Sequence, residues 1–149
     1  MTVQRSDHGG MTAQEIGDRL AIRELVDACA HCADRRDVEG QMSLFTSDTE
    51  FLVYMDSHKA DPTREINGRE GLRPVFENLR TYEATTHFDG QSTVVWKQDS
   101  ATGVSYCLAH HVKVDGTGRS LMIASVRYLD QFVKMDGRWY FRQRKLMVD

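Results

Sequence analysis

The chain has 149 residues, the usual length of one domain, and it can bury a core without disulfides or metal. Hydrophobic residues make up 40% and charged residues 28%, which is typical of a globular protein and excludes a disordered one. The formal net charge of −3 argues against the basic face that nucleic-acid binding requires. The short Arg-rich segments 35–36 and 142–145 have acidic neighbours, so we interpret them as solvated surface.

The sequence contains no apolar run near the roughly 20 residues that span a bilayer. Residues 1–10 are polar, end in Gly9-Gly10 and lack the hydrophobic core of a signal peptide. We therefore expect a flexible leader over residues 1–10, one domain over residues 11–149, no membrane partner and a cytoplasmic location. The three cysteines fit reduced thiols in that compartment.

The first half of the chain has helical periodicity. Apolar residues recur at i, i+3 and i+4 over 12–34, and Thr12 with Glu15 forms a capping-box pattern, so one long helix is predicted there. A short second helix is predicted over 38–45, a strand over 51–54 and a polar loop over 55–65. A turn at Asn67-Gly68 precedes a third predicted helix, over 69–79.

From Thr86 onward the period of the apolar residues changes to two, which indicates strands. The predicted strands are 87–97, 103–115, 119–134 and 138–147, with turns at Asp115-Gly116 and Asp136-Gly137. Each connection is too short for a crossover helix, so the strands form an antiparallel meander. Helices followed by such a meander define an α+β fold.

Two adjacent histidines lie in the strand predicted over 103–115, and they point to opposite faces of it. His110 shares its face with bulky apolar residues, where a neutral imidazole can be part of the core. His111 lies beside small residues, which fits either a cavity wall or an exposed sheet face. The pattern leaves open which histidine faces a pocket.

His87 lies at the start of the first long strand, where pockets commonly open, and histidine accepts protons readily near neutral pH. Such a base needs a carboxylate to orient it, but spacing alone does not name the partner. Asp34 ends the long helix, and periodicity offers no reason for it to face a pocket. Cys29 and Cys32 have CxxC spacing deep inside that helix, which favours core packing over redox or zinc chemistry.

The order of several segments resembles that of SnoaL-like proteins in the nuclear transport factor 2 superfamily. The resemblance covers residues 12–147 and is carried by segments 21–25, 33–37, 45–48, 86–88, 127–132 and 136–139. It implies a cone-shaped fold in which a curved antiparallel sheet wraps about three N-terminal helices around a deep pocket, also described as an α+β barrel or cystatin-like roll.

Within the superfamily, the chain is most similar to the scytalone dehydratase, hexachlorocyclohexane dehydrochlorinase and bile acid 7α-dehydratase groups. These enzymes use a histidine that abstracts a proton and an aspartate that orients it, and the matching positions are His87 and Asp34. The resemblance further implies that Tyr54 and His110 contact the substrate, with His111 as the neighbouring alternative. A pocket asparagine of scytalone dehydratase falls at Tyr128.

The chain also departs from these enzymes at positions that contact the leaving group. Ala33 replaces a tyrosine of scytalone dehydratase, and Cys29 replaces a polar residue of the other two groups. The proton-transfer pair is therefore kept while the leaving-group contacts are not.

The leading hypothesis is a cofactor-independent lyase or isomerase that acts on a small, mostly apolar organic molecule without a metal. His87 and Asp34 would transfer the proton, Tyr54 and His110 would polarise a carbonyl or assist a leaving group, and Arg127 would lie at the rim. The alternative is a non-catalytic small-molecule-binding or accessory protein with the same pocket. A homo-oligomer, dimer or trimer, is expected in either case.

A third interpretation is a dimer-forming scaffold. Pairing would use the outer face of the sheet. That face is predicted to be polar and hydrated, which leaves its use open, and its polar residues are Ser105, His111, Lys113, Arg127 and Gln131.

Overall fold

The computed structural model describes residues 10–149, so the predicted leader lies outside the described residues except for Gly10. The long helix α1 (Ala13–Arg35) begins at the predicted capping box. The Thr12 hydroxyl accepts a hydrogen bond from the Glu15 backbone N–H at 3.2 Å, and the Glu15 carboxylate accepts one from the Thr12 N–H at 2.7 Å. The helix ends at Arg36, which has a left-handed φ of 60° and whose backbone N–H caps the last turn of α1 by donating to the Ala33 carbonyl.

Two predicted helices are shorter in the structure than the periodicity indicates. Helix α2 (Val38–Met42) stops early because strand β1 (Phe45–Tyr54) already begins at Phe45. The helix predicted over 69–79 is divided into η2 (Arg69–Leu72), α3 (Arg73–Glu77) and η3 (Asn78–Thr81). Pro74 is the physical reason for one division, because it lacks a backbone N–H and fits only the first turn of a helix.

The described residues form one six-stranded sheet with the order β2-β1-β6-β5-β4-β3. The remaining strands are β2 (Arg64–Asn67), β3 (Ala84–Lys97), β4 (Ser100–Asp115), β5 (Gly118–Met135) and β6 (Arg138–Val148). The predicted meander from β3 to β6 is confirmed as antiparallel. Strand β1 pairs with β6 in parallel, so the sheet as a whole is mixed. The sequence missed β2, since this short edge strand is exposed except at Ile66.

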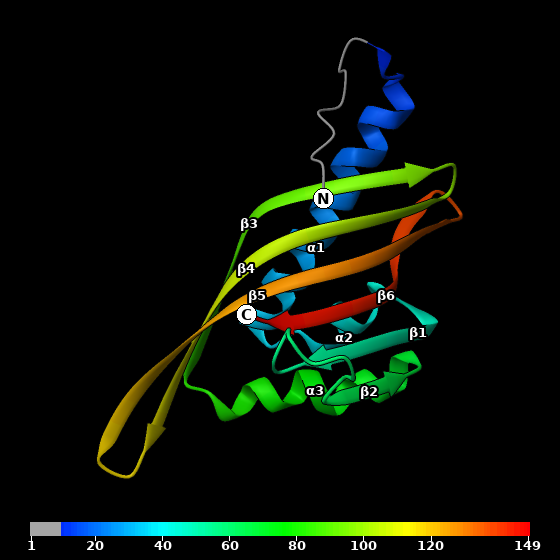
Figure 1. Ribbon diagram of the computed structural model, residues 1–149. Helices are drawn as coiled ribbons and strands as arrows, with labels where there is room; N and C mark the ends of the chain where they lie inside the picture. Colours follow the sequence, from blue (N-terminus) through cyan, green and yellow to red (C-terminus); the bar gives the residue numbers. More distant parts are fainter. Residues whose placement is uncertain (1–9) are drawn as a thin grey trace.

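The sheet is curved and does not close, and the helices lie on one side of it, which confirms the α+β class and the cone-like arrangement (Figure 1). The core between the layers contains the almost fully buried Ile22, Phe45, Leu72 and Phe141. The rings of Phe45 and Phe141 stack with centroids 4.9 Å apart, which joins β1 to β6. None of the helices in residues 10–149 combines the length and apolar character that crossing a bilayer requires.

The inward and outward faces of β4 are the reverse of what the size of their side chains suggests. The small residues Ser105, Cys107 and Ala109 are buried toward the helices, whereas Tyr106 and Leu108 are exposed on the outer face. A concave surface leaves little room for side chains, so small residues line it and the bulky ones point outward. The expectation that His110 sits in a core is therefore wrong, as is the placement of Ser105 and His111 on the outer face.

Candidate functional site

The site is built where the last turn of α1 meets the start of β3. The His87 Nδ1 lies 2.7 Å from Asp34 Oδ1, and the His87 backbone N–H donates to Asp34 Oδ2 at 2.9 Å. Because a carboxylate only accepts hydrogen bonds, the neutral form of the ring carries its proton on Nδ1 and has its lone pair on Nε2. The carboxylate thus holds both the ring and the backbone of the histidine.

Asp34 is itself held by two further side chains. The Thr85 hydroxyl donates to Asp34 Oδ1 at 3.0 Å, and the Arg36 guanidinium donates to the Thr85 oxygen at 2.6 Å. Arg36 also donates to the backbone carbonyls of Ala33 and Asp34, which ties it to the end of α1. This chain of donors fixes the carboxylate on the helix against the histidine on the strand. It also shows that Arg36 is not the free surface cation that the sequence indicated.

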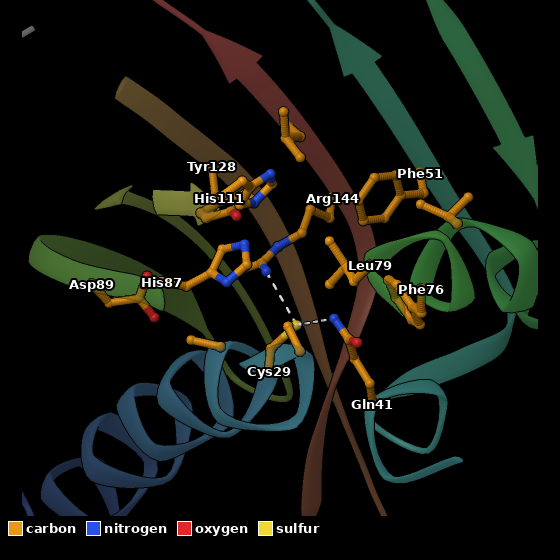
Figure 2. Close-up of a pocket in the computed structure, with 14 residues that line it drawn as sticks. Cys29, Gln41, Phe51, Phe76, Leu79, His87, Asp89, His111, Tyr128 and Arg144 are labelled. Atoms are coloured by element: carbon orange, nitrogen blue, oxygen red, sulfur yellow. Dashed lines mark hydrogen bonds between the residues drawn. The ribbon is translucent and has the colours of Figure 1, made fainter. Parts of the chain in front are cut away.

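His87 lines a pocket of about 150 Å³ between the helices and the concave face of the sheet (Figure 2). Such a cavity accommodates a molecule of about the size of benzene. Seven of its lining residues are apolar: Ala30, Ala33, Phe51, Val75, Phe76, Leu79 and Leu146. Seven others carry a polar atom or a sulfur: Cys29, Gln41, His87, Asp89, His111, Tyr128 and Arg144. Apolar walls with polar groups that converge on one space are typical of a small-molecule site.

Arg144 supplies a positive charge to the pocket from β6. Its Nε and Nη2 donate to the two oxygens of Asp130 at 2.8 and 2.9 Å, and the ring of Tyr128 lies 4.0 Å from the guanidinium. Its Nη1 points to the Cys29 sulfur at 3.4 Å, where Gln41 also donates. Burial disfavours the charge of Arg144, but the Asp130 carboxylate outweighs this and raises the pKa of the guanidinium. Arg144 therefore stays charged beside a weak sulfur acceptor.

His111 is the second histidine of the pocket. Its ring packs between those of Tyr82 and His87, with centroid distances of 4.5 and 5.4 Å. Within the described part of the chain, neither of its ring nitrogens has a hydrogen-bond partner. Burial lowers the pKa of His111, and the neighbouring His87 and Arg36 lower it further, so the imidazole is kept neutral. A neutral imidazole of this kind can donate to or accept from a ligand.

The structure brings together three of the six residues predicted for the site, namely His87, Asp34 and Tyr128. Tyr54, His110 and Arg127 do not line the pocket. Each of these three lies an odd number of positions along its strand from a residue that faces the pocket, so its own side chain points to the outward side. Phe51 in β1, His111 in β4 and Tyr128 in β5 occupy the inward positions.

The sequence did not single out Asp89 and Arg144, although strand periodicity contains a signal for both. Asp89 lies two residues after His87 and therefore shares its face of β3. Arg144 lies within the segment that we interpreted as solvated surface, yet only 3% of it is exposed. The position of Arg144 on the inward face of a central strand is the signal that could have identified it as a pocket residue.

The described residues offer no obvious metal site. No group of three or more His, Cys, Asp or Glu side chains in residues 10–149 is arranged to hold a metal ion. Cys29 and Cys107 are buried free thiols and Cys32 is a half-buried one, so the predicted CxxC pair forms no disulfide.

The model of the SnoaL-like domain family matches residues 14–145. The chain belongs to the SnoaL-like family. The resemblance found in the sequence is thereby confirmed, together with the fold of the nuclear transport factor 2 superfamily. No curated protein matches this SnoaL-like chain.

Three solved structures illustrate what the SnoaL-like chain is similar to. A provisionally assigned scytalone dehydratase from Novosphingobium aromaticivorans is 23% identical with a TM-score of 0.79, over 93% of this chain and 89% of that one. A protein of unknown function with a cystatin-like fold from Nostoc punctiforme is 27% identical with a TM-score of 0.71, over 93% and 94%. A hexachlorocyclohexane dehydrochlorinase from Novosphingobium barchaimii is 19% identical with a TM-score of 0.73, over 90% and 88%. At these low identities the two enzymes establish the shared fold only.

Proposed function

We propose that this SnoaL-like protein is a cofactor-independent lyase or isomerase that removes a proton from a small, mostly apolar organic substrate. The observation that supports this most directly is the 2.7 Å contact between His87 Nδ1 and Asp34, which leaves the lone pair of Nε2 for the substrate. The lyase names of two structural neighbours agree with it.

In the proposed mechanism, His87 Nε2 takes a proton from a carbon next to a carbonyl group. Asp34 keeps the ring in the required tautomer and stabilises the imidazolium that forms. The negative charge that develops on the substrate oxygen is stabilised by the guanidinium of Arg144 and by hydrogen bonding to His111. Tyr128, whose pKa burial raises well above the usual value, stays protonated and stacks on Arg144. Acid–base catalysis of this type contributes about 10²–10⁴-fold to a rate.

The size of the pocket limits the substrate. A volume of about 150 Å³ encloses one ring of about the size of benzene, and the pocket is open on one side, so substituents on the ring can extend toward solvent.

The test uses a β-chloro aryl ketone as probe, since its elimination gives an unsaturated ketone that is followed by ultraviolet absorbance. We expect His87→Gln to lower the enzymatic rate by about 10²–10⁴-fold. His110→Gln is the matched control, because His110 lies on the outer face of the next strand and the rate should not change. If His87→Gln eliminates the probe as fast as the unchanged protein does, the proposed function is wrong. Saturable binding of the probe without elimination or α-proton exchange would instead identify a binding protein.

We also propose that the protein forms a homo-oligomer through the outer face of its sheet. Phe88, Tyr106, Leu108, Leu121 and Ile123 are exposed there. Strand pairing places Phe88 beside Leu108, and Ile123 and Leu121 on the adjoining stretch of β5, so these exposed apolar side chains lie on neighbouring strands, with His110 and Ser125 among them. A surface of this kind on a small domain is typical of a protein–protein interface.

A further inference from the structure

A second ionisable residue of the pocket, Asp89, lies beside the proposed base. His87 and Asp89 occupy the same face of β3 and both line the pocket, while Phe88 between them is 67% exposed on the other face. Two residues along a strand span about 6.6 Å. A base and an acid at this spacing can act on neighbouring carbon atoms of one small molecule.

The backbone at Asp89 is held in place by α1. Arg23 donates from Nη1 to the Gly90 carbonyl at 2.9 Å and from Nη2 to the Asp89 carbonyl at 3.4 Å. The pairing of β3 with β4 shifts register between Asp89 and Ser92, which marks an irregularity of the strand directly after Asp89. Irregularities of this kind re-aim side chains next to active sites. The position of the Asp89 carboxyl is thus set by the helix as well as by the sheet.

The surroundings of Asp89 raise the pKa of its carboxyl. Burial raises the pKa of this carboxyl, and the Asp27 carboxylate of α1 adds to the effect. The hydrogen bond from the Cys107 thiol lowers the pKa, as do Arg144 of β6 and Arg23 of α1, without cancelling the effect of burial. The Cys107 thiol of β4 hydrogen-bonds to the carboxyl and keeps its own proton, since burial and Asp89 raise the pKa of the thiol to about 12.

We propose that Asp89 is the general acid that protonates the leaving group, and that the substrate is therefore a small β-hydroxy carbonyl compound. This inference rests on the proposed function of His87. A hydroxyl group leaves only when it receives a proton, whereas a halide leaves as a stable anion and needs none. A carboxylic acid beside the base can therefore assist the loss of a hydroxyl group, whereas the loss of a halide does not require it.

The proposed reaction is a balanced dehydration. His87 Nε2 takes the α-proton, the electron pair of that C–H bond forms the C=C bond, and the C–O bond to the β-carbon breaks. The oxygen leaves with the proton of the Asp89 carboxyl, so one water molecule is released. The imidazolium then returns its proton to the Asp89 carboxylate through solvent, which restores both groups.

The experiment compares two probes with one carbon skeleton, a β-hydroxy aryl ketone and its β-chloro counterpart. We expect Asp89→Asn to lower the rate on the β-hydroxy probe by about 10²–10⁴-fold and to lower the rate on the β-chloro probe far less. Asp115→Asn, at the exposed hairpin between β4 and β5, is the matched control and should act on both probes like the unchanged protein.

The outcomes separate this inference from the proposed function. If Asp89→Asn slows both probes equally or neither of them, Asp89 is not the acid, while a loss of both rates in His87→Gln still supports the base. Carbon-13 NMR of labelled aspartate carboxyls, with Asp89→Asn used to assign the signal, provides a test without any substrate. An Asp89 carboxyl that titrates at the ordinary aspartate value overturns the inference.

Discussion

Replacing Arg144 with methionine tests how far burial determines the strength of an ion pair in this protein. Arg144 and Asp130 form a two-pronged pair, and their side chains are 4% and 1% exposed. Arg144→Met keeps much of the side-chain volume but removes the charge, which leaves Asp130 without its cation. Arg127 and Asp149 offer a matched pair, because they also make two hydrogen bonds, each of 2.6 Å, but are 35% and 34% exposed.

The structure predicts very different costs for the two pairs. Removing one partner of a buried pair costs about 3–5 kcal/mol, since an uncompensated charge stays in a medium of low polarity. Arg127→Met should cost about 0.2–1 kcal/mol, because water solvates the Asp149 carboxylate once the arginine is gone. The double variant Arg144→Met/Asp130→Asn should recover part of the loss, since it no longer buries a lone carboxylate.

The assay is urea unfolding of the four proteins, followed by circular dichroism and analysed for the free energy of unfolding. It should be repeated at several pH values. In Arg144→Met, burial raises the pKa of Asp130 with no cation to oppose it, so the folded state binds a proton that the unfolded state releases. The loss of stability should therefore be small near the ordinary aspartate pKa of about 3.9 and should grow as the pH rises above it. Equal losses in Arg144→Met and Arg127→Met would refute the reasoning, as would a loss that does not depend on pH.

Two further predictions concern His111 and the outer face of the sheet. Because its folded-state pKa is lowered, His111 binds fewer protons in the folded protein than in the unfolded chain. The free energy of unfolding should therefore fall as the pH drops below about 6.5. His111→Gln should reduce this pH dependence in urea titrations. If the free energy of the variant falls with pH as steeply as before, the prediction is wrong. Leu108→Glu places a charge in the exposed apolar surface, so it should shift the protein toward monomer in sedimentation or light scattering. If Leu108→Glu keeps the same oligomeric state, the outer face is not the interface. The same conclusion follows if the protein without the substitution is already a monomer.

Features that depend on neighbours in the chain could be predicted from the sequence. The capping box at Thr12 and Glu15 forms as expected, because its two hydrogen bonds join residues three positions apart. The turn at Asp136-Gly137 also forms as expected, with φ values of 51° and 79° that these two residue types tolerate. The strand period of two located β3 to β6 to within a few residues.

The pairing of Asp34 with His87 was implied by family resemblance and not by spacing. Helical periodicity gave no reason for Asp34 to face a pocket. The carboxylate reaches the histidine because α1 crosses β3 at its C-terminal turn, which is a matter of how helix and sheet pack.

Tertiary structure alone decided which face of each strand points inward. On β4 the bulky residues Tyr106 and Leu108 suggested an inward face, but curvature of the sheet turned the small residues inward and made His111 the pocket histidine. Arg144 and Asp130 are cross-strand partners in β6 and β5, and the helices that pack on this face bury them both. Alternation along a strand separates two sets of residues but does not say which set meets the helices, because that depends on contacts between segments far apart in the chain.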